Sequence, residues 1–91
     1  MATTLFSGTA PGTSTASGTG VPGDIMFTAI GTPGFGVAEI QLSNDAGTNW
    51  ISTGARFDNN DMTPKIVTFV TGQTYRIKAS GKDFDLTIER A

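Results

Sequence analysis

The sequence predicts an all-β fold, an antiparallel β-sandwich of about seven short strands. Apolar and polar residues alternate with period two in several stretches, and helical periodicity is absent along the chain. Glycine, proline, asparagine and aspartate separate these stretches, as expected for turns. With 91 residues and no cysteine, the chain is expected to form one domain whose stability depends on packing or assembly.

The composition argues against several classes of function. The chain has no histidine for a hydrolytic triad and no cysteine to act as a nucleophile or a metal ligand. A net charge of −2 argues against binding to nucleic-acid phosphate or to an anionic membrane. No apolar run approaches the roughly 20 residues of a membrane helix, and the N-terminus lacks the pattern of a secretion signal. We therefore expect a soluble, non-enzymatic protein with no cofactor, metal, nucleic-acid or membrane partner.

Residues 1–23 differ from the rest because they contain no charged side chain. After Leu5 and Phe6 they are rich in glycine, threonine, serine and alanine, so a flexible leader is one interpretation. Disordered tails usually carry charge, which favours an extended arm held by a partner. The predicted organisation is an N-terminal arm over residues 1–23, with Leu5 and Phe6 binding the partner, and a β-sandwich over residues 24–91.

Two strands are predicted over residues 24–30 and 37–43, with a turn at 31–34. The first is apolar on both faces, and the second alternates between an apolar and a polar face.

The segment that follows, Ser-Asn-Asp-Ala-Gly-Thr-Asn-Trp at 43–50, resembles the Asp-box hairpin, with Asn49 in place of the usual threonine. The Asp45 carboxylate is expected to accept backbone N–H groups across the turn, and Gly47 to supply a positive φ. The resemblance implies that the Trp50 ring folds back over the hairpin and is buried, and it implies no catalytic role.

A short return strand is predicted over residues 49–53, and a further one over 54–57. The Asp-Asn-Asn-Asp cluster at 58–61 offers oxygen ligands, but it lacks the glycine and the distal glutamate of an EF-hand loop. We interpret it as a structural loop; a weakly bound cation is the alternative.

The C-terminal third is predicted to form neighbouring strands of one sheet. Residues 65–71 and 75–79 alternate around a glycine-containing turn, as in a hairpin. The last strand, residues 83–89, is expected beside the strand over 75–79, so that its acidic residues pair with Arg76 and Lys78.

Residues 70–79 also resemble the segment leading into strand F of immunoglobulin-like domains, where a tyrosine follows a turn glycine by three residues. In this tyrosine corner Gly72 makes the turn, and Tyr75 buries its ring while its hydroxyl bonds to nearby backbone. The resemblance implies an immunoglobulin-like sandwich, with a jelly roll as the alternative.

The whole chain is similar to small virion proteins of tailed bacteriophages of the decoration or cement kind. This resemblance implies a structural component of the virion, made in the host cytoplasm, whose arm binds other virion proteins or copies of itself in a homo-oligomer or lattice. A carbohydrate- or surface-binding module is the alternative, and it needs Trp50 or Phe35 exposed for stacking. A third interpretation, an accessory domain of a larger protein, is disfavoured by the initial methionine and the complete-looking ends.

Overall fold

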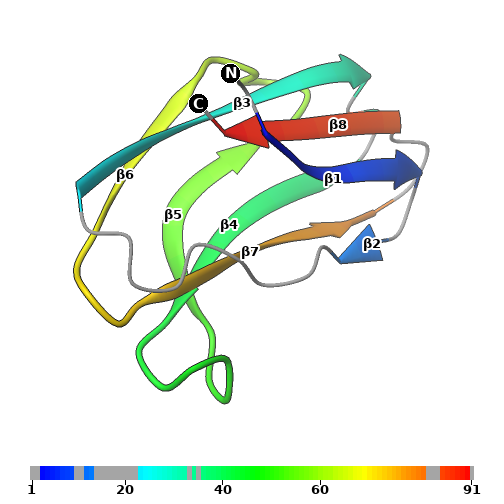
Figure 1. Ribbon diagram of the computed structural model, residues 1–91. Coiled ribbons are helices and arrows are strands. Elements are labelled where there is room, and N and C mark those ends of the chain that lie inside the picture. The colour runs from blue at the N-terminus through cyan, green and yellow to red at the C-terminus, as the bar shows by residue number, and fades with distance from the viewer. Residues whose placement is uncertain are drawn as a thin grey trace.

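The computed structural model describes residues 3–9, 12–13, 23–32, 34, 36–81 and 85–90. These residues form eight β-strands (Figure 1): β1 (Thr3–Thr9), β2 (Gly12–Thr13), β3 (Gly23–Thr32), β4 (Val37–Ser43), β5 (Ile51–Phe57), β6 (Lys65–Phe69), β7 (Thr74–Ser80) and β8 (Asp85–Arg90).

The strands pair antiparallel in two sheets, with the orders β1-β8-β3-β6 and β2-β7-β4-β5. The pairs β1/β8, β2/β7, β3/β6 and β4/β5 are those of one long hairpin, and the pairs β3/β8 and β4/β7 roll this hairpin into two layers. The predicted antiparallel β-sandwich is confirmed. The rolled hairpin is the arrangement of a jelly roll, the alternative to the immunoglobulin-like topology. An immunoglobulin sandwich places its last strand beside the preceding one, whereas β8 lies between β1 and β3.

The predicted hairpin over residues 65–79 is wrong, because β6 and β7 belong to different sheets. The Gln73 backbone N–H donates to the Val70 carbonyl oxygen over 3.2 Å, and this turn carries the chain from one layer to the other. The rings of Phe69 and Tyr75 consequently meet between the sheets, with their centroids 5.3 Å apart.

The predicted charge pairing of the last strand is wrong for the same reason. β8 does not lie beside β7, so its acidic side chains are not cross-strand neighbours of Arg76 and Lys78. The Arg76 side chain instead donates from Nε to Gln41 Oε1 over 2.8 Å.

The described part of the first 23 residues belongs to the sandwich itself. β1 pairs with β8 from Thr3 to Thr9, and β2 pairs with β7. Phe6 is buried in the hydrophobic core, and Leu5 lies in β1 where the register with β8 shifts. These residues therefore do not form an arm bound to a partner. They supply the first two strands of the rolled hairpin. Residues 14–22 lie outside the described residues.

The core lies between the two sheets and receives alternate side chains from both. Its largest members are aromatic, and the rings of Phe27 and Tyr75 meet edge to face at 5.4 Å between centroids. Among the described residues the buried apolar side chains are Phe6, Ile25, Phe27, Ala38, Ile40, Phe57, Val67, Phe69, Tyr75, Ile77, Ala79, Leu86 and Ile88.

Candidate interaction surface

The hairpin between β4 and β5 is held by a compact polar network. The Ser43 hydroxyl donates to Asp45 Oδ1 over 2.6 Å and accepts the backbone N–H groups of Asp45 and Gly47. Asp45 in turn accepts the Asn49 backbone N–H at Oδ1 and the Asn49 side-chain amide at Oδ2, over 2.8 and 2.6 Å. Gly47 has a φ of 94°. Every polar group of this network bonds within the hairpin, so the segment is a structural turn, in which Asn49 contributes the side-chain donor.

These hydrogen bonds lower the pKa of Asp45 to about 2, chiefly through the Ser43 hydroxyl and then through Asn49. The native pKa lies below that of the unfolded chain, so the stabilisation is complete above about pH 4 and is lost as the pH falls toward 2. We expect Asp45→Asn to lower the urea midpoint of unfolding at pH 6, and the gap from the wild type to narrow on acidification. Urea titrations at several pH values measure this gap. A gap that stays constant would contradict the assignment.

Trp50 does not belong to the hydrophobic core, contrary to expectation. It is half-buried at the base of the hairpin, and the Arg76 guanidinium lies over its ring, 4.5 Å from the centroid. A Cβ built on Gly47 would come within 3.4 Å of the ring, so the indole does fold back against the turn. The ring is therefore covered by a cation and lies outside the apolar core.

The Tyr75 hydroxyl also differs from the tyrosine-corner expectation. Gly72 makes the preceding turn with a φ of 93°, and the Tyr75 ring is buried. Its hydroxyl is buried as well, but it has no hydrogen-bond partner among the described residues. The reason is topological, because the rolled order of strands surrounds the ring with apolar side chains such as Phe27 and Phe69.

Tyr75→Phe is therefore expected to leave the free energy of unfolding unchanged or to raise it by about 1 kcal/mol, since a buried hydroxyl without a partner is destabilising. A tyrosine corner with a bonded hydroxyl predicts a loss of about 1 kcal/mol instead. Urea unfolding distinguishes an unchanged or raised free energy of unfolding from a lowered one. Tyr75→Leu, which also removes the ring, serves as the destabilised control.

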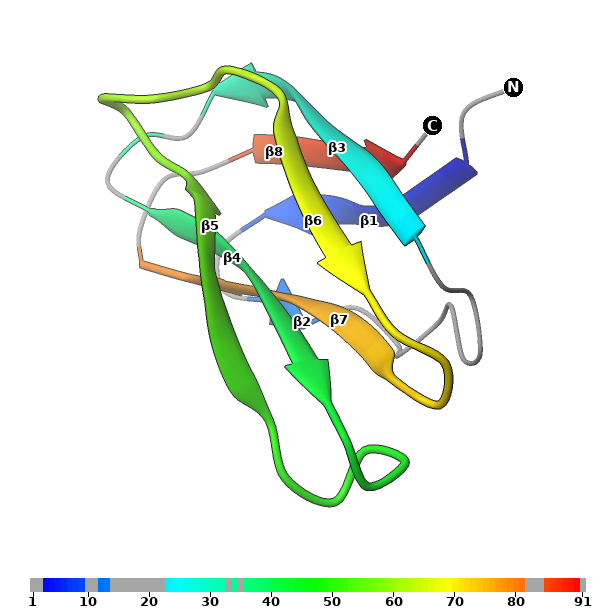
Figure 2. The same cartoon turned by 90° about the vertical axis from the view of Figure 1, so that its left-hand side faces the viewer.

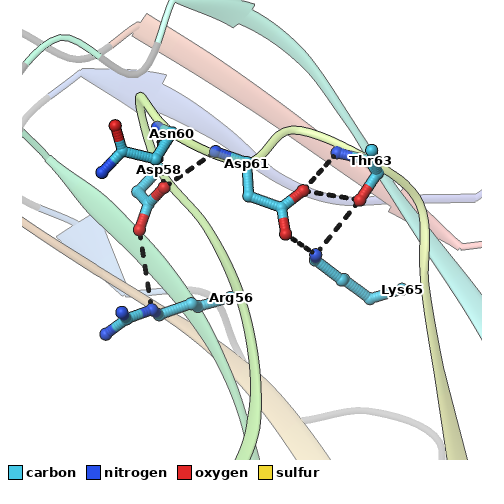
Figure 3. A network of polar contacts seen from close by, with 6 residues as sticks. All are labelled: Arg56, Asp58, Asn60, Asp61, Thr63 and Lys65. Carbon is cyan, nitrogen blue, oxygen red and sulfur yellow. Dashed lines mark hydrogen bonds and ion pairs between the residues drawn. The ribbon is translucent and has the colours of Figure 1, made fainter.

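The Asp-Asn-Asn-Asp segment forms a closed loop between β5 and β6 (Figure 3). Asp58 and Asp61 exchange two backbone hydrogen bonds, and their carboxylates contact Arg56 and Lys65 respectively. The Lys65 ammonium and the Thr63 hydroxyl and N–H hold the pKa of Asp61 well below its usual range. Both carboxylates are thus engaged in protein contacts. The described residues hold no group of three or more ligand side chains suited to a metal ion.

The outer faces of the two sheets differ in chemistry. On the β2-β7-β4-β5 sheet, Glu39 stands between Lys78 on one neighbouring strand and Arg56 on the other. Gln41 links Glu39 to Arg76 through two side-chain hydrogen bonds. This face is charged, and Glu39, Gln41 and Arg76 are joined by hydrogen bonds, which is typical of a surface that remains in water.

The outer face at the β3/β6 margin exposes large apolar side chains, with one polar pair among them. Ile66 is 66 % exposed and stands directly opposite Met26, which is 39 % exposed, and Val70, just beyond β6, is 60 % exposed. Between them Thr68 donates its hydroxyl to Asp24 over 2.5 Å. We call the outward side chains of Met26, Ile66, Thr68 and Val70 the β6 surface. Exposed apolar side chains gathered on one face commonly mark an interaction site.

The β6 surface also borders a sheet edge, because β6 is the outermost strand of its sheet, beside β3 (Figure 2). Of the four edge strands described, β1 carries a register shift, β2 has two residues, and β5 bulges opposite Ile40, where the Thr53 hydroxyl bonds to the Ile40 carbonyl. β6 pairs with β3 along its whole length without a shift. Its lysine, Lys65, is bound to Asp61 at the end of the strand. Bulges and very short strands blunt an edge, so β6 is the described edge most open to pairing.

The predicted site residues fall in three places. Asp45, Gly47 and Trp50 build the β4–β5 hairpin, Gly72 and Tyr75 build the crossing between the sheets, and Phe6 is in the core with Leu5 on the same strand. None of them lies on the β6 surface. Ile66 and Val70 alternate with Val67 and Phe69 in the sequence, but both sets are apolar, so the pattern alone does not tell which set faces outward.

Comparison of the chain with protein-family models, with curated proteins and with solved structures gave no match. Its function therefore has to be inferred from its own geometry. The described residues include no helix with the length and apolar character that crossing a membrane requires.

Proposed function

We propose that the protein is a non-enzymatic structural component of a bacteriophage virion, of the capsid-decoration kind, and that it attaches through the β6 surface. The observation that carries this proposal is that exposed apolar side chains lie next to a sheet edge that has no bulge and no register shift. Two-layer jelly rolls are common in viral capsid proteins and in lectins, which supports the class by analogy of fold alone.

The attachment needs no separate arm. A strand edge adds backbone hydrogen bonds to an extended segment of a neighbour, and the adjoining side chains of Ile66 and Val70 supply apolar contact. Each such contact is small, but a subunit that meets its neighbours on a repeating lattice gains strength through avidity. The charged outer face of the other sheet, with Glu39, Arg56 and Lys78, stays in solvent.

The carbohydrate-binding alternative finds less support in the geometry. A sugar stacks on an open aromatic face, whereas the Arg76 guanidinium already covers the Trp50 ring. Phe35, the other candidate for stacking, lies outside the described residues.

The proposal is tested by analysing which proteins are present in phage particles, purified from cells that carry the genome encoding this chain. We expect the wild-type protein in the particles, Ile66→Lys to be lost from them, and Lys78→Glu, a charge change on the opposite outer face, to be retained. Absence of the wild-type protein from the particles, or equal retention of both variants, would overturn the proposal. Circular dichroism of the isolated variants checks that each is folded. Both substituted side chains are exposed, so both variants are expected to keep the fold.

A further inference from the structure

We infer that β6 pairs antiparallel with β6 of a second copy of the chain, about a two-fold axis at Thr68, so that the two β1-β8-β3-β6 sheets join into one. This inference rests on the proposed function, in that it names the neighbour that the β6 surface meets. An edge strand has one row of backbone N–H and C=O groups without a strand beside it. The regular pairing of β6 with β3 leaves that row straight over Lys65–Phe69.

Charge favours a second copy in the antiparallel orientation. From Ile66 to Thr74 the chain has no charged residue, so the strand itself opposes no like charges. Parallel pairing would place the two Lys65 side chains about 4.8 Å apart, on adjacent strands. Antiparallel pairing about Thr68 separates them by six residues, about 20 Å, which exceeds the Debye length of about 8 Å at physiological salt. The two Asp24 carboxylates, one strand farther out on each side, are then about 14 Å apart.

The apolar pattern selects the register. With the axis at Thr68, Ile66 of each copy faces Val70 of the other, so the two most exposed apolar side chains of the β6 surface cover each other. On the inner side Val67 then faces Phe69, a β-branched and aromatic pair of the kind that stabilises sheets. Val70 contributes its side chain alone, because its backbone N–H and C=O already bond to Gln73.

The resulting contact is short. It comprises three backbone positions from each strand and two symmetric Ile66–Val70 side-chain pairs, which is less than a standard interface. The dimer is therefore weak in solution and becomes significant where many copies are held side by side.

Cysteine cross-linking tests the inference, because the chain has no cysteine of its own. Facing residues of antiparallel strands have Cα atoms about 4.5–5.5 Å apart, within the range of a disulfide. Thr68→Cys in the full chain, oxidised at about 100 μM to favour a weak contact, is expected to give a disulfide-linked dimer. The matched control is Ser7→Cys on β1, the opposite edge of the same sheet, where the hydroxyl likewise bonds to one neighbouring side chain, Thr87.

A charge reversal tests the register. In the Thr68→Cys background, Ile66→Lys is expected to reduce the rate of dimer formation about tenfold, because two symmetric contacts are lost. Adding Val70→Glu places an opposite charge in front of each new lysine and is expected to restore the dimer. Within one chain positions 66 and 70 are about 14 Å apart, too far for that rescue to be internal.

Three outcomes would overturn the inference: cross-linking of Thr68→Cys no faster than that of Ser7→Cys, no effect of Ile66→Lys, or no rescue by Val70→Glu. All three are read from the isolated protein. A chain that dimerises yet is absent from phage particles therefore refutes the proposed function alone, and one that is present in particles without dimerising refutes the pairing alone.

Discussion

Replacing Phe6 with alanine is expected to lower the free energy of unfolding by about 3–5 kcal/mol, the usual cost of removing a buried phenylalanine. Phe6 is 8 % exposed and enters the core from β1, beside Ile88 of β8. A small domain has about 5–15 kcal/mol of stability in total, so the variant is expected to be close to unfolding. Urea titration followed by the fluorescence of Trp50, the single tryptophan, measures the change.

Thr4→Ala is the matched control, because Thr4 lies on the same strand and is exposed. It is expected to change stability by less than about 0.5 kcal/mol. An N-terminal arm held by a partner predicts that Phe6→Ala leaves the isolated protein as stable as the wild type. That result would remove β1 from the sandwich and return residues 1–23 to the arm interpretation.

The strands that the sequence predicts well are those with local alternation. The range 37–43 corresponds to β4, and 75–79 lies within β7, because one face of each strand is apolar and the other polar. The two short strands expected over 49–57 are instead one strand, β5, interrupted by a bulge at Gly54, whose φ is 84°. The local alternation of apolar and polar residues locates a strand. A bulge inside the strand interrupts this alternation and so looks like the end of one strand and the start of the next.

β1 and β2 are missed for a different reason. Their threonine, serine and glycine content is typical of a linker. The evidence for a strand lies in the partners β8 and β7, whose paired residues are about 65 to 87 positions away in the chain. The sheet order is equally non-local. The sequence shows that residues 65–71 and 75–79 flank a turn, but not that the turn changes layers.

The interaction surface depends on that sheet order. An edge strand with two apolar faces looks the same in sequence as a central one, so neither the exposure of Ile66 nor the open edge of β6 could be predicted from the chain alone. The Tyr75 hydroxyl is a further case: a tyrosine three residues after a turn glycine predicts the buried ring, while its hydrogen bond depends on which strands surround it.

Gly31→Ala is expected to be the other strongly destabilising change, by about 3–5 kcal/mol, because strain and steric overlap add at this position. Gly31 has a φ of 116°, and a Cβ built there would lie 2.2 Å from the Asp85 carbonyl oxygen. That oxygen belongs to the backbone of β8, so it cannot turn aside as a flexible side chain can. Urea unfolding of the purified variant measures the loss.

Gly23→Ala separates the two causes, since Gly23 has a similar φ of 107° but no atom of the described residues within 4 Å of the added Cβ. It is expected to cost about 1–3 kcal/mol from strain alone. The excess at Gly31 then measures how closely β3 approaches the start of β8, which is the contact that places β8 between β1 and β3. Equal losses in the two variants would mean that this approach is looser than described.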